Sequence, residues 1–209
     1  MIDLYSANTP NGKKISIMLE EIGFDYKVIK VDINNGEQFK DEFKKISPLS
    51  KIPVIIDHKN KKTIFESGAI LIYLAELSGK FYNSEERLEI NQWLMAQMGY
   101  VGPMLGQHHQ FHHYNPGKSK FGEERYFKIS KRIYEELDER LSKSKSSKLV
   151  LIVIFSASLT ISITSSVDIA AISLISPPTS TKPPFLVPVR KVSTATLDEL
   201  LFCKAFVKT

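Results

Sequence analysis

The chain has 209 residues, which is long enough to bury a sizeable core and to form one or two domains. Its formal net charge of +5 is spread thinly, which disfavours a nucleic-acid surface, because such surfaces concentrate positive charge. Cys203 is the single cysteine, so an internal disulfide framework is excluded and a reducing compartment, the cytoplasm, is expected. The sequence shows no signal-peptide pattern, and the apolar run 149–155 is too short to span a bilayer, so no membrane partner is expected.

Residues 1–80 show alternating signals for strands and helices. Apolar residues at helical spacing from Ile15 to Ile22, followed by Gly23, predict a helix that begins near Pro10. Two apolar runs around a polar KNKK turn predict an antiparallel hairpin. The expected order is strand, helix, strand, helix, strand, strand, helix, which fits a thioredoxin-like α/β unit: Ile2–Tyr5, 10–22, Tyr26–Val31, Gln38–Ile46, Ile52–Ile56, Thr63–Phe65 and Ala69–Leu77.

The end of the hairpin carries the first candidate site. Ser67 follows the second apolar run and stands where a helix begins, so its hydroxyl and the first-turn N–H groups are suited to hold a carboxylate. Pro53 interrupts an otherwise good strand, which indicates a sheet edge, a bulge or a cis peptide bond. A strand that pairs with a bound peptide, close to a carboxylate site, predicts a receptor for a short peptide.

The rest of the chain divides into a linker at 81–86, a helical second domain at 87–148 and an atypical end. Helices are expected at Glu85–Leu105 and Glu123–Leu141, and 108–115 either continues the first or forms a loop. Residues 149–209 contain no glycine, tyrosine or tryptophan, and two Pro-Pro pairs interrupt them. We interpret this segment as a diverged or frame-shifted tail, although Ser165–Ala170 fits a capping-box helix start.

Several motifs, each weak alone, occur together in a specific order and spacing. They are LYSANTPNGKKISIMLEE near the start, Gln38, Ile52-Pro53 ahead of Glu66-Ser67, and GPMLGQHHQFHH at Gly102–His113. Together they resemble the nu-class bacterial glutathione transferases and their yeast-prion-like relatives, over Met1 to Leu141. The resemblance implies a thioredoxin-like N-terminal domain, an all-α C-terminal domain, a homodimer, and the activity of a glutathione-dependent disulfide-bond oxidoreductase.

The resemblance also implies how glutathione, reduced or as its disulfide, would bind. Ser67 and Glu66 are suited to the γ-glutamyl carboxylate and ammonium, and Ile52 before Pro53 to backbone pairing with the cysteinyl part. The resemblance alone places the other candidates: Gln38 and Lys51 near the glycyl end or the peptide backbone, Thr9 and Asn11 near the sulfur as catalytic residues, and Arg132 at a second glutathione.

The first domain has no cysteine, so exchange through a protein Cys-x-x-Cys pair is excluded and the reacting sulfur has to come from glutathione. The helix that begins near Pro10 would favour a thiolate through its dipole. Ser6, at the end of the first strand, is a rival activating group, whereas Tyr5 is expected in the core. The histidines from His108 to His113 are interpreted as a polar wall of the site and not as a metal site.

Two other functions remain open at this point. The same site could conjugate glutathione to an electrophile, or the scaffold could serve as a non-catalytic binding or regulatory protein. The expected small-molecule partner is therefore a disulfide or an electrophile. Each candidate residue taken alone also fits an ordinary role as a helix cap, an edge-strand proline or a surface side chain.

Overall fold

The computed structural model describes residues 1–143, which form two compact units. The first unit spans Met1–Gln92, and the second begins at Trp93. The interpretations of 149–209, including Cys203, lie outside the described residues, as does the end of the predicted helical domain. The linker proposed at 81–86 stays a prediction.

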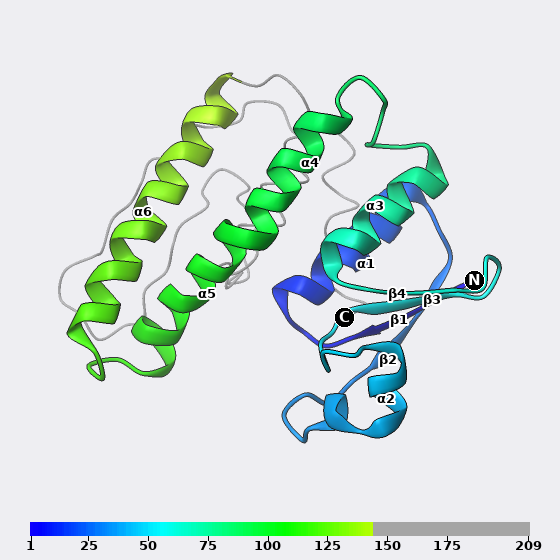
Figure 1. The fold of residues 1–209 in the computed structure, drawn as a ribbon, viewed down its shortest axis with the longest axis horizontal. Helices are drawn as coiled ribbons and strands as arrows, with labels where there is room; N and C mark the ends of the chain where they lie inside the picture. The colour runs from blue at the N-terminus through cyan, green and yellow to red at the C-terminus, as the bar shows by residue number, and fades with distance from the viewer. Residues whose placement is uncertain (144–209) are drawn as a thin grey trace, which may run out of the picture. The chain divides into compact units, whose positions relative to one another are not determined.

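A four-stranded sheet forms the first unit, in the order β2-β1-β3-β4 (Figure 1). Strand β1 pairs in parallel with β2, while β3 pairs antiparallel with both β1 and β4. The chain order of strands and helices predicted from the sequence is confirmed, including the hairpin. The strands and helices of this unit are β1 (Ile2–Ser6), α1 (Pro10–Ile22), β2 (Tyr26–Lys30), α2 (Asp41–Ile46), β3 (Val54–Asp57), β4 (Lys62–Phe65) and α3 (Ser67–Ser78).

The sheet is covered on both faces, with α1 and α3 together on one side and α2 on the other (Figure 1). Strand β1 alternates accordingly: Tyr5 points to the α2 side, where its ring lies 6.3 Å from that of Phe43. Leu4 must then face the opposite layer, and it is fully buried. Tyr5 is thus part of the core packing, as expected.

Helix α1 begins and ends as its sequence predicts. The Thr9 side chain caps its first turn, Pro10 occupies the first helical position, and Gly23 ends it in the left-handed region at φ 76°. The single helix expected at Gln38–Ile46 is wrong in detail. A short 3-10 turn at Glu37–Phe39 is separated from α2 by the extended residue Lys40, and two acidic residues then begin α2, where they suit the positive end of the helix dipole.

The second unit is helical. It includes α4 (Arg87–Ala96) from Trp93 onward, a π-helical turn at Gln97–Val101, α5 (Gly102–His109), a second π-helical turn at Gln110–Tyr114 and α6 (Lys120–Lys143). The chain therefore continues as helix through 108–114. Helices α5 and α6 enclose a small apolar cluster of Val101, Leu105, Ile129, Ile133 and Leu137. No helix among residues 1–143 is long and apolar enough to cross a membrane.

Candidate active site

Three segments that carry predicted site residues meet at one end of the first unit's sheet. The register pairs Tyr5 with Val54 and Val54 with Phe65. The turn after β1, the approach to β3 and the turn after β4 are therefore neighbours. They carry, respectively, Thr9 and Asn11, Lys51 to Pro53, and Glu66 with Ser67.

The first of these segments is the N-terminus of α1, which lies directly against the end of β1. The Thr9 Oγ1 atom accepts a hydrogen bond of 3.2 Å from the Gly12 backbone N–H. A Cβ atom at Gly12 would overlap both Ser6 Oγ and the Ala7 carbonyl oxygen, so glycine permits this close approach. Ser6 is 2 % exposed and donates its hydroxyl to Ala7 O at 3.3 Å. The rival activating hydroxyl is therefore buried behind the helix start.

Asn11 is exposed on the first turn of α1, and its partner is a residue that the sequence reasoning missed. Lys14 Nζ donates a hydrogen bond of 2.8 Å to Asn11 Oδ1, although the Lys14 side chain is almost completely buried. Burial lowers the pKa of Lys14 to about 8, and the Glu66 carboxylate opposes part of that shift. One signal was available in the sequence, because Lys14 lies one helical turn before Met18 and so falls on the apolar face of α1.

The approach to β3 is fixed by Ser47, which is buried. Its hydroxyl donates to Lys51 O at 2.8 Å and accepts from Lys51 N–H at 3.0 Å, while the Lys51 side chain is exposed. The Ile52–Pro53 peptide bond is cis, which decides among the three interpretations of this proline. The main chain of Lys51 and Ile52 is thereby held beside the start of β3.

The turn after β4 places Glu66 and Ser67 at the start of α3. Glu66 is exposed and has φ 70° and ψ 117°, a conformation that only a few non-glycine residues adopt. Its side chain makes no capping hydrogen bond to the first turn of α3. Ser67, which was predicted where the helix begins, is the first helical residue and is buried. This helix start can therefore offer backbone donors to an anion.

Gln38 lies in the loop between β2 and α2, half-buried. Its Nε2 donates to Ile33 O at 3.2 Å, which directs the amide oxygen the other way. The Oε1 atom is buried and has no hydrogen-bond partner among the described residues. An acceptor in this state is suited to a ligand N–H group.

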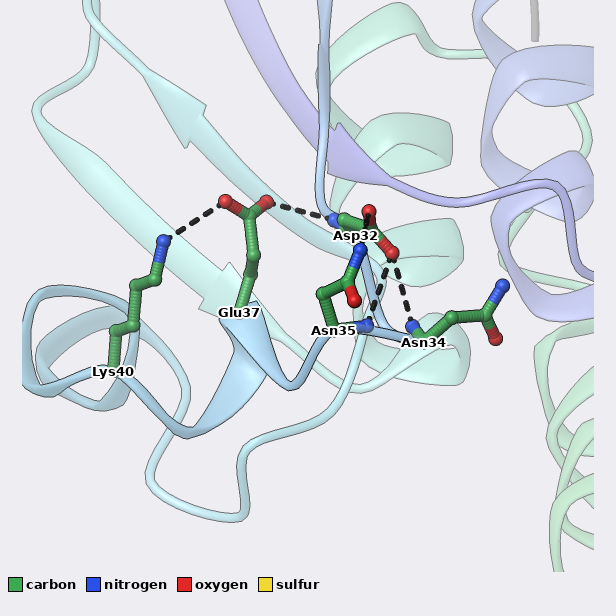
Figure 2. A network of polar contacts seen from close by, with 5 residues as sticks. All are labelled: Asp32, Asn34, Asn35, Glu37 and Lys40. Atoms are coloured by element: carbon green, nitrogen blue, oxygen red, sulfur yellow. Dashed lines mark hydrogen bonds and ion pairs between the residues drawn. The ribbon is translucent and has the colours of Figure 1, made fainter.

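The loop that carries Gln38 is held by its own polar contacts (Figure 2). Asp32 accepts hydrogen bonds from the backbone N–H groups of Asn34 and Asn35, each at 3.1 Å. Its own N–H donates to Glu37 at 2.8 Å, and Glu37 pairs with Lys40 at 2.9 Å. The Asn35 side chain, which donates to Asp32 Oδ2 at 2.6 Å, and the backbone N–H groups of Asn35 and Asn34 lower the pKa of Asp32. The Asp32 N–H and Lys40 lower the pKa of Glu37. An ordered loop of this kind gives Gln38 a defined position.

Arg132 belongs to the second unit, where it is exposed on α6. Its assignment to a second glutathione stays a prediction. The histidines of α5 and the following π-helical turn contact one another, with ring centroids 4.3 Å apart for His108 and His112. Among the residues that the structure describes, no group of three or more His, Cys, Asp or Glu side chains is placed to hold a metal ion.

Comparison with known proteins identifies the family. The family model described as glutathione S-transferase, N-terminal domain, matches residues 1–76. The disulfide-bond oxidoreductase YfcG of Escherichia coli (strain K12) is 50% identical over 151 residues, which cover 69% of this chain and 70% of YfcG. The chain belongs to the glutathione transferase family. A second relative of this glutathione transferase, the disulfide-bond oxidoreductase YghU of the same organism, is 38% identical, but the match spans only 54% of YghU.

Solved glutathione transferases agree with this assignment. One from Pseudomonas putida, with one glutathione disulfide bound per subunit, has a TM-score of 0.68 and 39% identity over 76% of this chain and 75% of that one. One from Burkholderia graminis, with two glutathione molecules bound per subunit, has a TM-score of 0.69 and 38% identity over 76% and 70% of the two chains. The thioredoxin-like fold followed by a helical region is therefore confirmed.

Proposed function

We propose that this glutathione transferase is a glutathione-dependent disulfide-bond oxidoreductase. The observation that carries the proposal is its 50% identity, over most of both chains, to a relative named for that activity. Similar proteins that have been crystallised with glutathione or its disulfide bound support the choice of ligand. Residues 1–92 contain no cysteine, so the protein cannot form a mixed disulfide in this part of the chain.

The ligand would lie across the three neighbouring segments at the end of the sheet. The start of α3 and Ser67 suit the γ-glutamyl carboxylate, and the exposed Glu66 carboxylate suits its ammonium. The main chain at Ile52 suits the cysteinyl part. Two further residues complete the proposed site: Gln38, through its unpartnered buried oxygen, and Lys51, through its exposed ammonium.

Bound glutathione supplies the thiolate, which attacks one sulfur of a disulfide, expels the other as a thiolate and forms a mixed disulfide with the substrate. The thiolate of a second glutathione then attacks the glutathione sulfur of that mixed disulfide, which gives glutathione disulfide and releases the second substrate thiolate. The chain's own contribution is to favour the thiolate. The start of α1 offers its positive dipole end. Thr9 Oγ1 already accepts from Gly12 N–H, so its hydroxyl proton is directed to another acceptor. Asn11 adds an amide donor on the same exposed turn.

Disulfide exchange is favoured over the two alternatives. Both Escherichia coli relatives are named disulfide-bond oxidoreductases, which favours exchange over conjugation to an electrophile and over a purely regulatory role. Arg132, with its exposed guanidinium, is proposed to hold a carboxylate of the second glutathione. A homodimer in the cytoplasm is part of the same proposal, supported by the family and by the single cysteine.

The proposal is tested on the full chain by calorimetry with glutathione and glutathione disulfide, together with turnover of a small disulfide and of an aromatic halide. Asn11→Ala should lower disulfide reduction by roughly 100- to 1,000-fold, the scale for removing one preorganised donor. Asn34→Ala is the matched control, because the Asn34 side chain is exposed and only its backbone N–H contacts Asp32. Absence of glutathione binding, or turnover of the halide alone, would contradict the proposal.

A further inference from the structure

Lys14 is a buried cation at the start of α1. It is 2 % exposed and is among the largest fully buried side chains of the described residues. Burying an ammonium is expensive unless hydrogen bonds and charge compensate for the lost water. Two of the interactions that compensate for it are the hydrogen bond to Asn11 Oδ1 at 2.8 Å and the electrostatic attraction of the Glu66 carboxylate. The buried Lys14 ammonium therefore contacts the first turn of α1, which carries the proposed thiolate donors.

The contact with Lys14 decides how the Asn11 amide is oriented. An amide side chain has an acceptor end and a donor end, which look alike in shape, and its hydrogen-bond partners determine which way it turns. An ammonium has only donors, so the Asn11 oxygen faces Lys14 and the Nδ2 group faces away from it. Asn11 itself is exposed, so the Nδ2 donor faces away from the buried ammonium and is open to a ligand.

We propose that Lys14 is a positioning residue for the reaction, because its buried ammonium holds the oxygen of Asn11 and thereby presents the Asn11 Nδ2–H group to the sulfur of glutathione. This inference rests on the proposed function of the site. The hydrogen bond from the Lys14 ammonium to the Asn11 oxygen also polarises the Asn11 amide, which makes its Nδ2–H group a stronger donor. Lys14 thus acts on the thiolate through Asn11 and does not touch it.

Other properties of Lys14 agree with this role. Burial lowers its pKa to about 8, so the ammonium form still predominates at pH 7. The Glu66 carboxylate, which raises that pKa, belongs to the turn proposed to hold the γ-glutamyl end. The charge of Lys14 is therefore attracted electrostatically to a residue at the other end of the proposed ligand site.

The test measures the pKa of the glutathione thiol when it is bound to the full-length protein, from thiolate absorbance against pH, together with kcat and KM. Lys14→Met and Asn11→Ala should each raise the thiol pKa by about one unit, a typical effect of losing one nearby donor or charge. The double variant should raise it no further than Asn11→Ala alone. Lys13→Met is the matched control, since it removes the same charge from the next residue, and its thiol pKa should stay at the wild-type value.

Three outcomes would overturn the inference. The thiol pKa could stay unchanged in Lys14→Met, the two substitutions could add, which would mean that Lys14 acts without Asn11, or Lys13→Met could raise the pKa equally. If Lys14→Met does not fold, Lys14→Arg decides, because it keeps a charged donor: a thiol pKa close to wild type supports the inference, and one as high as in Asn11→Ala overturns it. Wild-type protein that binds no glutathione would instead overturn the proposed function and this inference together.

Discussion

The two units of this glutathione transferase stabilise their folds in different ways. In Met1–Gln92, seven polar or charged residues are buried: Ser6, Lys14, Ser16, Ser47, Ser50, Asp57 and Ser67. All four non-glycine residues with positive φ among residues 1–143 also lie in this unit. The described part of the second unit has two buried polar residues, Gln97 and Ser130, beside its apolar cluster and its stacked aromatic side chains.

The difference indicates where each unit carries its function. Buried polar groups and unusual backbone angles hold individual hydrogen-bonding atoms in defined positions, as a binding site requires. Apolar contacts are not directional and hold only the packing of one helix surface against another. In the second unit, for example, Gly122 admits the Phe111 ring, which would lie 2.6 Å from a Cβ atom there. The four predictions that follow test this contrast, from the largest expected effect to the smallest.

The largest change in the free energy of unfolding is expected in the apolar core of the first unit. Leu4 is fully buried in the central part of the sheet, so Leu4→Ala should lower the free energy of unfolding by about 2–5 kcal/mol through lost burial and a cavity. Denaturant unfolding measures this change. Leu88→Ala, at a leucine that is 74% exposed, is the control and should stay within about 0.5 kcal/mol of wild type. Equal effects of the two substitutions would contradict the burial described here.

A buried turn should be nearly as important as the core. Asp57 is 2% exposed; its Oδ2 accepts from Tyr73 Oη at 2.6 Å and from Asn60 Nδ2 at 2.8 Å, and its Oδ1 from two backbone N–H groups. Asp57→Ala should therefore cost about 1–3 kcal/mol of unfolding free energy. The matched control is Asp32→Ala, which removes a similar turn carboxylate from an exposed loop and should cost less.

The same carboxylate predicts an acid dependence. Burial alone would raise the pKa of Asp57, but hydrogen bonds from Tyr73, Asn60 and the backbone outweigh it and hold the pKa at about 2, below the ordinary 3.8. The contribution of the ionised Asp57 side chain to the free energy of unfolding is then complete above pH 3.8 and is lost as the pH falls through about 2. The stability difference between wild type and Asp57→Ala should narrow over this window. A constant difference would contradict the assignment.

The smallest effect is expected in the second unit, at His108. Burial lowers the pKa of His108 to about 4, assisted by the charges of His112 and His109. In the unfolded chain His108 has an ordinary pKa of 6.5, so it binds the proton more readily there than in the folded protein. The contribution of neutral His108 to the free energy of unfolding is therefore complete above pH 6.5 and is lost as the pH falls through about 4. His108→Gln should thus change stability by less than about 1 kcal/mol at pH 7 and should lose less than wild type between pH 6.5 and 4.

The exposed His113 supplies the control for that measurement. His113→Gln makes the same substitution on the following π-helical turn; His113 acts on the pKa of His109 and not on that of His108, so this variant should change the pH profile of unfolding less than His108→Gln. A profile of His108→Gln that runs parallel to wild type over the whole window would show that the acid response of this unit has another source.

Much of the fold followed from local patterns in the sequence. The hairpin, the helix that begins at Ser67 and the end of α1 at Gly23 were predictable because turn residues and apolar periodicity specify them directly. The break at Lys40 was missed, because Gln38–Ile46 has helical composition throughout and the contacts that close the loop before it come from Asp32. The π-helical turns were missed for a similar reason, since no local signal distinguishes them.

The candidate site was predicted less completely than the fold. Residues at helix starts, such as Thr9 and Ser67, have recognisable positions, and the bond before Pro53 was one of three interpretations that the structure could decide. Lys14 was overlooked because a lysine in a sequence is expected at the surface, and only the packing of α1 against the sheet shows that it is enclosed. Whether Gln38, Lys51 and Arg132 bind glutathione stays a prediction.

Gly12 has a consequence for how this family can vary. A single added methyl group at that position would collide with Ser6 Oγ and with the Ala7 carbonyl oxygen, so the start of α1 can lie this close to the end of β1 only with glycine there. A larger residue at position 12 would require the first turn of α1, which carries Asn11, to move away from the end of β1. The absence of a side chain at Gly12 thus sets the distance between the start of α1, with its donors Thr9 and Asn11, and the end of β1.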